Sequence, residues 1–477
     1  MLKVTLQETF FDHLPKTSPE FKPLCVQSGA CSTVEYESDS RIDQIDVVYL
    51  GQGRFGTVFH GQTEGPGGSV AQVAMKKVPK AAVRSLISLR NLANEIACMR
   101  HLTHAKTTAA PGSAEALELE HIVTLHSVRT SNSSVYLEQS FGGSDLFSVV
   151  SRCSRDVAPL PTVVMAAIAR GLIMGVAAMH RQNWCHRDIK SENILLGVSA
   201  KQLLSMPNAN DAAAAVHVQL CDFGVCASLR GLPLRQFCGS PGFFAPELAD
   251  MMRGTQHSTV SATCSVDGDA SPFYDGAAAD VFSLGAALYE MLVGTKRFTK
   301  TWSSAYVDYA VRDRRDLERS LTDARNVAAA ELQVADAADV DGMSTTAPAG
   351  GAIGLPQLNA LALGCLALDP RARPTSDAIV ATMVHPAAPT EVAARGGGDG
   401  GGGGLFPRRR RHYPRDAEGG DVSPLFAARP QPPAPRASLP LCRDDQRPAE
   451  ESHDNGAALP GSIASPPLPS VRHVRLD

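Results

Sequence analysis

Three glycines near the start of the globular part of the chain limit what it can fold into. They form the run Gly51-Gln52-Gly53-Arg54-Phe55-Gly56. A β-prone run, 47–50, precedes them, and Thr-Val-Phe follows at 57–59. A dinucleotide-binding fold would begin a helix at the third glycine, whereas β-branched and aromatic residues favour a second strand. The sequence therefore predicts a hairpin. Its turn either lets the backbone approach phosphates, with the positive φ angles that glycine tolerates, or is structural alone.

Composition is that of an ordinary globular protein, with 44% hydrophobic and 20% charged residues among 477. A net charge of −4 excludes a generally basic nucleic-acid coat and a strongly acidic solvating chain, so no nucleic-acid partner is expected. The 11 cysteines include no CxxC pair. Scattered cysteines of this kind are typical of reduced thiols, so we expect a cytoplasmic or nuclear protein.

The sequence predicts no membrane span. Its first residues contain no apolar run of signal-peptide length. The most apolar stretch, 163–179, is interrupted by Arg170, which favours a buried helix over a membrane helix.

Composition also divides the chain into three parts. Residues 1–43 form an N-terminal extension, and 44–386 form the globular domain. Four stretches rich in Ala, Ser, Thr, Asp and Gly interrupt that domain and predict loop insertions, at about 105–119, 199–215, 250–272 and 325–354. Residues 387–477 form a Gly/Pro/Arg-rich tail, which we expect to be disordered, because 396–477 hold 12 glycines and 13 prolines.

The tail carries two motifs of its own. The basic run at 407–412 is either a nuclear-import signal, a patch for an anionic surface or a solvated run of charge. The PxxP spacings at 430–433 and 432–435 are typical of segments that dock in aromatic grooves of the SH3 or WW type.

A lysine and a glutamate are predicted to pair. Residues 73–76 (Val-Ala-Met-Lys) predict a third strand, and 84–103 predict a helix because apolar residues recur at helical spacing. Glu95 lies beside the apolar face of that helix. A carboxylate near the buried side needs a cation, since an unpaired buried charge is costly, and Lys76 is the candidate. Taken alone, Glu95 would more often be a surface residue.

The sequence contains two further motifs that are typical of a known family. They are His-Arg-Asp-Ile-Lys-Ser-Glu-Asn at 186–193 and Asp-Phe-Gly at 222–224. Together with the glycine run, the lysine strand and the helix glutamate, they resemble a eukaryotic protein kinase of the Ser/Thr type. The resemblance covers about 44–386. It implies an α+β, two-lobed fold, with a β-rich small lobe holding one key helix and a mainly helical large lobe.

The resemblance implies a catalytic centre that uses ATP and Mg²⁺. Asp188 would orient the substrate hydroxyl and accept its proton, and Lys190 would stabilise the transferred phosphoryl group. Asn193 and Asp222 would supply oxygen ligands to Mg²⁺.

The resemblance also implies a nucleotide pocket. The glycine run would cover the phosphates, Lys76 would contact the α- and β-phosphates, and Glu95 would hold Lys76 in place. Leu137 resembles the gatekeeper, and backbone groups near Glu138 and Ser140 would bond adenine. The apolar residues that would enclose the ring are Val58, Ala74 and Leu195, each of which could equally be plain core.

Three segments resemble the large lobe. Residues 237–247 end in Ala-Pro-Glu, 280–285 read Asp-Val-Phe-Ser-Leu-Gly, and 368–375 contain Arg373. They predict a buried Glu247–Arg373 ion pair, which is architectural rather than catalytic.

The activation segment, 222–247, departs from the family pattern. Its hydroxyl residues are Ser228 and Ser240, and Gln236 stands where related kinases often carry a phosphorylated Thr. Arg187 remains as the would-be phosphate partner. We therefore expect that this segment needs no phosphate at that position.

The sequence thus predicts an ATP-dependent serine/threonine protein kinase acting on protein substrates, with Glu192 and Asp145 favouring basic residues upstream of the acceptor. The alternative is a pseudokinase or scaffold that binds partners through its insertions and Pro-rich tail. Pseudokinases usually lack one of the motif residues, whereas this sequence has all five, which argues for activity. They are Lys76, Glu95, Asp188, Asn193 and Asp222. The strand after the glycine run argues against a nucleotide-binding metabolic enzyme.

Overall fold

The glycine run lies in an antiparallel sheet in the computed structural model, which describes residues 10–11, 13–14, 31–37, 42–53, 56–64, 70–156, 159–231, 233–256, 273–307, 312–340 and 353–384. The strand order is β1-β2-β3-β4-β6-β5. The strands are β1 (Cys31–Glu37), β2 (Ile42–Gln52), β3 (Thr57–Glu64), β4 (Val70–Pro79), β5 (Leu125–Thr130) and β6 (Ser134–Ser140). The predicted hairpin is confirmed, since β2 pairs with β3 across the glycine turn.

The register of this sheet aligns residues from three neighbouring strands. Val58 of β3 lies opposite Lys76 of β4, and Lys76 lies opposite Leu137 of β6. Side chains of such cross-strand partners point to the same face of a sheet. Three predicted nucleotide-pocket residues therefore share one face.

One long helix, α2 (Leu86–Thr108), packs beside the sheet and carries Glu95. It begins at Ser85, whose side chain accepts the backbone N–H of Ser88 in a reciprocal capping box. Its buried face includes Leu92, Ile96 and Met99, as predicted. It runs five residues beyond the predicted end, because the first helix breaker is Pro111.

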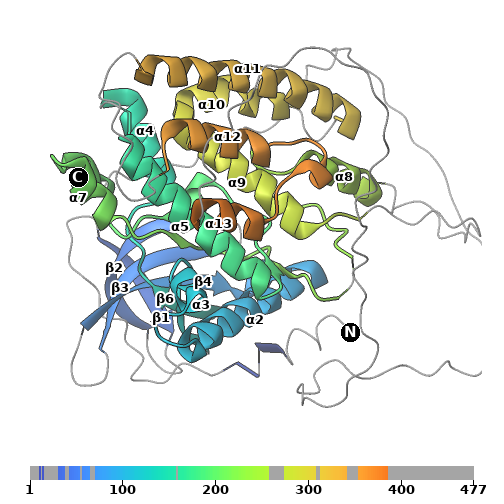
Figure 1. Ribbon diagram of the computed structural model, residues 1–477. Helices are drawn as coiled ribbons and strands as arrows, with labels where there is room; N and C mark the ends of the chain where they lie inside the picture. The colour runs from blue at the N-terminus through green and yellow to red at the C-terminus, as the bar shows by residue number, and fades with distance from the viewer. Residues whose placement is uncertain are drawn as a thin grey trace, which may run out of the picture. The chain divides into compact units, whose positions relative to one another are not determined.

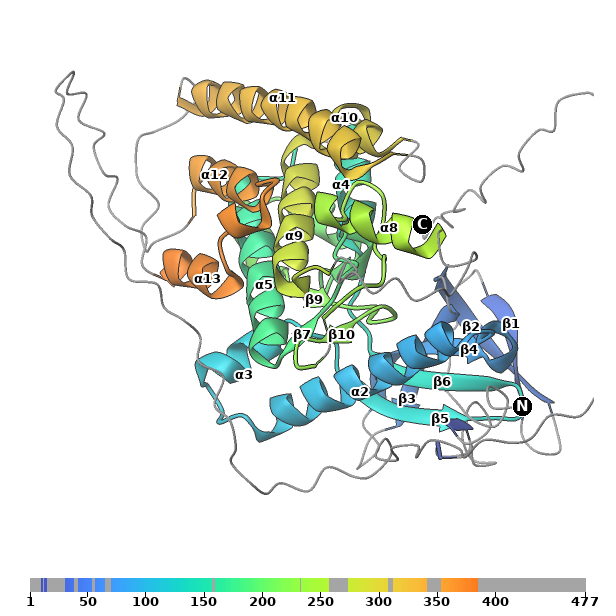
Figure 2. The ribbon, with the colours of Figure 1, turned by 90° about the vertical axis from the view of Figure 1, so that its right-hand side faces the viewer.

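The rest of the described chain is mainly helical (Figures 1 and 2). The longer helices are α4 (Leu146–Asp156), α5 (Thr162–Arg181), α9 (Gly276–Val293), α11 (Arg314–Val340), α12 (Leu355–Cys365) and α13 (Ser376–Val384). Shorter ones are α3 (Ala114–Leu119), α6 (Ala200–Ser205), α7 (Ala209–Ala215), α8 (Ala249–Gln256) and α10 (Thr295–Thr301), with 3₁₀ turns at Lys80–Ala82, Ser191–Asn193, Pro246–Leu248, Ser303–Tyr306 and Pro370–Ala372. Two small ladders, β7 (Trp184–Cys185) with β10 (Ala227–Ser228) and β8 (Ile194–Leu195) with β9 (Gln219–Leu220), shape the connecting loops. The predicted α+β fold, with a β-rich and a helical lobe, is confirmed.

Two central helices form the core of the helical lobe. By length and composition α5 and α9 could each cross a membrane, but 72% and 78% of their apolar windows are buried inside the described fold. Around α9 the ring of Trp302 packs at 6.0 Å from that of Phe282, tilted, and at 5.8 Å from that of Tyr289, edge to face. The apolar character of both helices is therefore used in packing, as predicted for 163–179.

The expectation of loops in the four low-complexity stretches is wrong for much of what the structure describes of them, although 109–113, 206–208 and 353–354 lie outside helices and strands. Helices α3, α6, α7 and α8 and the C-terminal half of α11 lie within or overlap these stretches. Helices α3 and α6 begin at Ser113 and Ser199, each of which accepts a backbone N–H from the first helical turn, and Asn208 caps α7 in the same way. Alanine, which we took as a loop signal, is the strongest helix former.

Helix α11 shows the missed pattern most clearly. Its buried residues are Leu317, Leu321, Ala324, Ala328 and Leu332. These recur every three or four residues, which is the spacing of one helix face. The last two lie in the stretch that we predicted to be a loop.

Several predictions concern residues outside the described ranges. These are Arg54 and Phe55 of the glycine run, 257–272 and 341–352 of the insertions, and the whole tail, 387–477, with its basic run and PxxP spacings.

Candidate active site

The predicted lysine–glutamate pair is confirmed and has a third member. Lys76 Nζ lies 2.6 Å from Glu95 Oε1 and 2.7 Å from Asp222 Oδ1. Strand β4 supplies the lysine, helix α2 the glutamate, and the segment after β9 the aspartate. Lys76 and Glu95 are buried, whereas the Asp222 side chain keeps 37% of its surface exposed. Asp222 is therefore the carboxylate that a ligand can reach.

Charge in this cluster is set by mutual contact. Burial lowers the pKa of Lys76, but the carboxylates of Asp222 and Glu95 outweigh burial and hold that pKa above its usual range. Burial raises the pKa of Asp222, but Lys76 outweighs it and lowers that pKa to about 2. Burial raises the pKa of Glu95, with Lys76 opposing it. At neutral pH the site presents an ammonium ion beside an ionised Asp222.

The glycine turn lies directly above this cluster. A Cβ atom on Gly53 would lie 3.9 Å from Asp222 Oδ2, an ordinary contact, so this part of the turn lies next to the carboxylate. A Cβ atom on Gly56 would meet the Lys77 carbonyl oxygen at 2.2 Å, so that glycine is required by the approach of β3 to β4. The predicted positive φ angles are wrong, because neither these two glycines nor Gly51 adopts one. Close approach therefore explains Gly56, and neither close approach nor backbone handedness requires glycine at 51 or 53.

Asp188 is held at the centre of a polar network. Its Oδ1 accepts from the hydroxyl of Ser240 at 2.8 Å, and its Oδ2 lies 3.3 Å from Lys190 Nζ. Lys190 also donates to Ser240 Oγ at 3.0 Å. Asn193 Nδ2 donates to the Asp188 carbonyl at 2.8 Å, which leaves Asn193 Oδ1 as its acceptor atom. The structure thus brings together the three predicted residues and adds Ser240.

Two residues of the site adopt a left-handed backbone. Arg187 has φ 67° and Asp222 has φ 60°, a region that side chains other than glycine rarely occupy. Asp280 of α9 holds the first turn in place, because its carboxylate accepts the backbone N–H groups of His186 and Arg187, each at 2.7 Å. The backbone before Asp222 is held by His186, whose Nε2 lies 2.9 Å from the Cys221 carbonyl oxygen.

Phe223 links the Asp-Phe-Gly motif at 222–224 to the motif at 186–193. Its ring lies 5.3 Å from the His186 ring, and both side chains are fully buried. Met99 of α2 belongs to the same hydrophobic core.

The four apolar residues predicted to enclose adenine differ in burial. Leu137 and Ala74 are buried, and Val58 and Leu195 are half-buried. A Cβ atom on Gly142 would lie 2.6 Å from Leu195 Cδ1, so the linker after β6 packs closely on β8.

One of the backbone groups near Glu138 and Ser140, predicted to bond adenine, is engaged within the protein: the N–H of Ser140. This N–H donates to the Thr124 carbonyl at 2.9 Å, because β6 remains in the sheet as far as Ser140. The Glu138 side chain accepts from the hydroxyl of Ser127 at 2.8 Å and does not face the slot as a free carboxylate.

The donor set fits a magnesium–nucleotide complex. The described residues contain no cluster of three His, Cys, Asp or Glu side chains that could hold a metal alone. Asp222 and Asn193 offer hard oxygen atoms, and Mg²⁺ usually takes one or two protein oxygens and completes its shell with phosphate and water.

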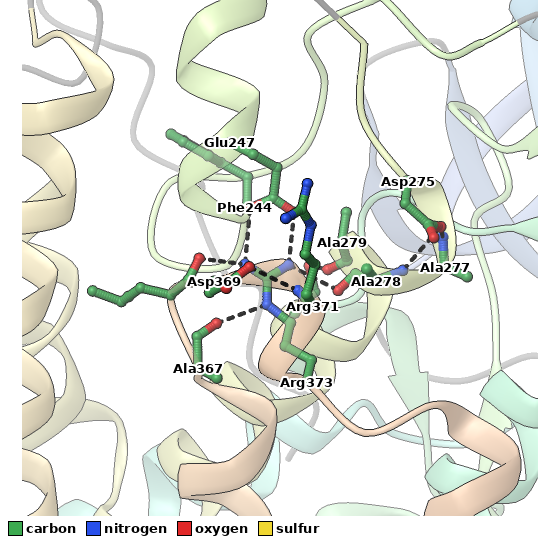
Figure 3. Close-up of polar contacts among 12 residues, drawn as sticks. Phe244, Glu247, Asp275, Ala277, Ala278, Ala279, Ala367, Asp369, Arg371 and Arg373 are labelled. Carbon is green, nitrogen blue, oxygen red and sulfur yellow. Dashed lines mark hydrogen bonds and ion pairs between the residues drawn. The ribbon is translucent and has the colours of Figure 1, made fainter. Parts of the chain in front are cut away.

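The predicted Glu247–Arg373 pair is confirmed (Figure 3). Arg373 Nη1 lies 2.6 Å from Glu247 Oε1, and Nη2 lies 2.8 Å from Oε2. The guanidinium also donates to the carbonyls of Ala367 and Ala278 and lies 4.9 Å from the ring centre of Phe282. The pair is a bidentate anchor for the end of the activation segment.

Sequence reasoning missed three residues that support the site. Asp280 was noted only as part of a motif, Glu290 accepts from the Ser191 hydroxyl at 2.6 Å, and Tyr274 contacts Arg187. Their partners lie about 90 residues away, so no local spacing signals these contacts.

Comparison with known proteins agrees with this geometry. A family model described as "Protein kinase domain" matches residues 45–385. Similar curated proteins include CBL-interacting protein kinase 30 of Oryza sativa subsp. japonica, 28% identical over 53% of this chain and 42% of that protein. Serine/threonine-protein kinase 36 of Mus musculus is 28% identical over 55% of this chain and 16% of its own length. CBL-interacting serine/threonine-protein kinase 20 of Arabidopsis thaliana is 28% identical over 51% and 44%.

The chain thus spans less than half the length of these relatives. The match to the family model covers well over half of this chain, and the motifs occur in the family's order. The chain belongs to the protein kinase family.

Proposed function

We propose that this chain is an active serine/threonine protein kinase, which transfers the γ-phosphoryl group of MgATP to hydroxyl groups of proteins. One observation carries the proposal: Lys76 Nζ contacts Glu95 and Asp222 at the same time. This contact joins the sheet, α2 and the predicted metal ligand in one arrangement, which phosphoryl transfer requires.

The side chains of the chain divide the work between them. MgATP, when bound, supplies the phosphoryl group and the metal charge that neutralises it. Lys76 brings positive charge to the phosphate site, and Asn193 and Asp222 offer oxygens to the metal. Asp188 is placed to orient a hydroxyl and to accept its proton, as its contact with the Ser240 hydroxyl illustrates. Lys190, beside Asp188, stabilises negative charge on the group in transit.

A kinase assay with MgATP and a generic basic protein tests this proposal. Asp188→Asn should lower the rate about 10²- to 10⁴-fold, with incorporation in the wild type on serine and threonine. Asp211→Asn, which changes an exposed carboxylate on α7 in the same way, is the matched control. Nucleotide binding without any incorporation by the wild type would favour the scaffold reading instead.

The acceptor's surroundings follow from charge. We propose that the substrate carries basic residues upstream of the hydroxyl, where Glu192 is exposed and Asp145 and Glu290 lie near it. Burial is the main cause of the raised pKa of Glu290, and the negative charges of Glu192 and Asp145 raise it further. These three carboxyl groups are therefore close to one another. Asp145 also caps α4 by accepting from Ser148, so Glu192 is the freer carboxylate. A peptide array with no basic preference would refute this specificity.

Two proposals rest on the sequence alone. The PxxP spacings at 430–435 are proposed to dock an SH3- or WW-type groove, and deletion of 430–435 should abolish capture by such domains. Cytoplasmic or nuclear residence is proposed from cysteine usage and the basic run, and alanine replacement of 408–411 should remove any nuclear fraction seen by microscopy.

A further inference from the structure

A buried arginine of the catalytic loop has only neutral partners. Arg187 is 6% exposed, and its Nε donates to the Val225 carbonyl at 2.6 Å. Its Nη1 donates to the Tyr274 hydroxyl at 3.0 Å. Among the residues that the structure describes, no carboxylate forms an ion pair with this guanidinium. A buried cation normally requires hydrogen-bond partners of fixed position, and here one of the two is a tyrosine hydroxyl.

Tyr274 connects that arginine to the activation segment. Its hydroxyl donates to the Gln236 carbonyl at 3.0 Å, and its backbone N–H donates to the Leu234 carbonyl at 3.1 Å. The Cys238 sulfur lies 3.7 Å from the same hydroxyl. Tyr274 is itself 5% exposed, so the segment 234–238 is fastened to a buried side chain.

A second contact fastens Gln236 from the other side. Arg90 of α2 donates from Nη2 to Gln236 Oε1 at 3.3 Å. The Gln236 backbone and side chain therefore bridge Tyr274 and the helix that carries Glu95. This contact is exposed, so it contributes less than the buried one.

The fastened segment leads directly to the catalytic aspartate. Gly239 has φ 101°, and a Cβ atom there would lie 3.2 Å from the Arg187 carbonyl oxygen. The next residue, Ser240, donates its hydroxyl to Asp188. Gln236 is thus only four residues before the serine that contacts Asp188, so a less ordered backbone at Gln236 would disturb that contact.

We propose that Tyr274 is a positioning residue for phosphoryl transfer, and that its hydroxyl does internally what an added phosphate would otherwise do: it connects Arg187 to the activation segment. The proposal rests on the proposed function. The segment offers little for phosphorylation, because Ser228 bonds to the backbone of Arg230, and Ser240 is bonded to Asp188. The kinase should therefore be active without phosphate on 222–247.

Tyr274→Phe tests the role of the hydroxyl, because it keeps the ring and removes both hydrogen bonds. Tyr289→Phe is the matched control, since it removes a hydroxyl bonded to Glu331 on another side of the helical lobe. Loss of a hydrogen bond to a charged group corresponds to a factor of roughly 10 to 100. We expect kcat of Tyr274→Phe to fall by about that factor while the Kd for ATP stays within about twofold. The Tyr289→Phe control should keep wild-type kcat.

Phosphatase treatment tests the second half of the proposal. The treated wild type should keep its kcat, with no phosphate on 222–247 by mass spectrometry. A kcat of Tyr274→Phe equal to that of Tyr289→Phe would overturn the positioning role, and loss of activity after phosphatase with a phosphate mapped in 222–247 would overturn the phosphate independence.

Hydrogen exchange separates this proposal from the proposed function. Tyr274→Phe should accelerate amide exchange across 233–240 relative to Tyr289→Phe, whether or not the wild type transfers phosphate. Unchanged exchange there would overturn the anchoring even in an active kinase. An inactive wild type with the expected exchange would refute the kinase proposal alone.

Discussion

Arg373→Met isolates the contribution of the pair in Figure 3 to stability. Methionine fills most of the space but leaves the Glu247 carboxylate, 7% exposed, without its bidentate partner. Removing one partner of a buried pair costs about 3–5 kcal/mol, because the other charge stays buried. The carbonyls of Ala367 and Ala278 also lose donors, so we expect a value near the upper end.

Thermal unfolding followed by circular dichroism measures this loss. Unfolding entropy of roughly 2.1 cal/mol/K per residue, over about 340 residues of kinase domain, gives about 0.7 kcal/mol/K. A loss of about 5 kcal/mol then lowers Tm by about 7 °C.

A second variant tests the cause of that loss. Arg373→Met combined with Glu247→Leu removes the stranded charge, so the double variant should be more stable than Arg373→Met alone. A decrease of less than 2 °C for Arg373→Met, or a double variant whose loss equals the sum of the single losses, would refute the reasoning.

Two further variants probe burial and close packing. Burial raises the pKa of Glu290 from 4.5 to about 7, so its protonated form stabilises the fold at low pH and that stability is lost as pH rises through about 7. The free energy of unfolding of Glu290→Gln, measured in urea, should therefore rise relative to that of the wild type by roughly 3 kcal/mol between pH 4.5 and pH 8. An unfolding free energy that changes equally with pH in both proteins would contradict this. Gly56→Ala should lower Tm by several degrees because its Cβ would meet the Lys77 carbonyl at 2.2 Å, whereas Gly51→Ala, with open space around its Cβ, should leave Tm almost unchanged. Equal Tm values for the two alanine variants would show that the sheet adjusts freely.

The sequence predicted what depends on local patterns or on charge that must be paired. The hairpin followed from β-branched residues after Gly56, and the Lys76–Glu95 pair followed from a carboxylate beside the apolar face of its helix. That pair was predictable because a buried charge restricts the choice of partner to very few residues. The Glu247–Arg373 pair followed from the resemblance to the protein kinase family.

Other features were not predictable for physical reasons. The alanine-rich part of α11 after residue 324 reads as a loop because alanine is a weak hydrophobic signal, although Ala328 and Leu332 continue the buried stripe of Leu317 and Leu321. The engagement of the Ser140 N–H with the Thr124 carbonyl was not predictable, because sequence does not reveal where β6 leaves the sheet. Tyr274 gave no signal at all, since its neutral hydroxyl can bond to many partners.

The turn that carries Arg187 depends on stabilising contacts and also positions the proposed catalytic residue. A left-handed backbone at an arginine is unfavourable by itself, so surrounding contacts must fix it. Asp280 fixes the backbone with both carboxylate oxygens, and Tyr274 together with the Val225 carbonyl fixes the side chain. The same turn presents Asp188, the next residue in the chain. Contacts that look architectural therefore act on the position of the carboxylate that we propose as catalytic, and substitutions at them should change kcat before they change nucleotide affinity.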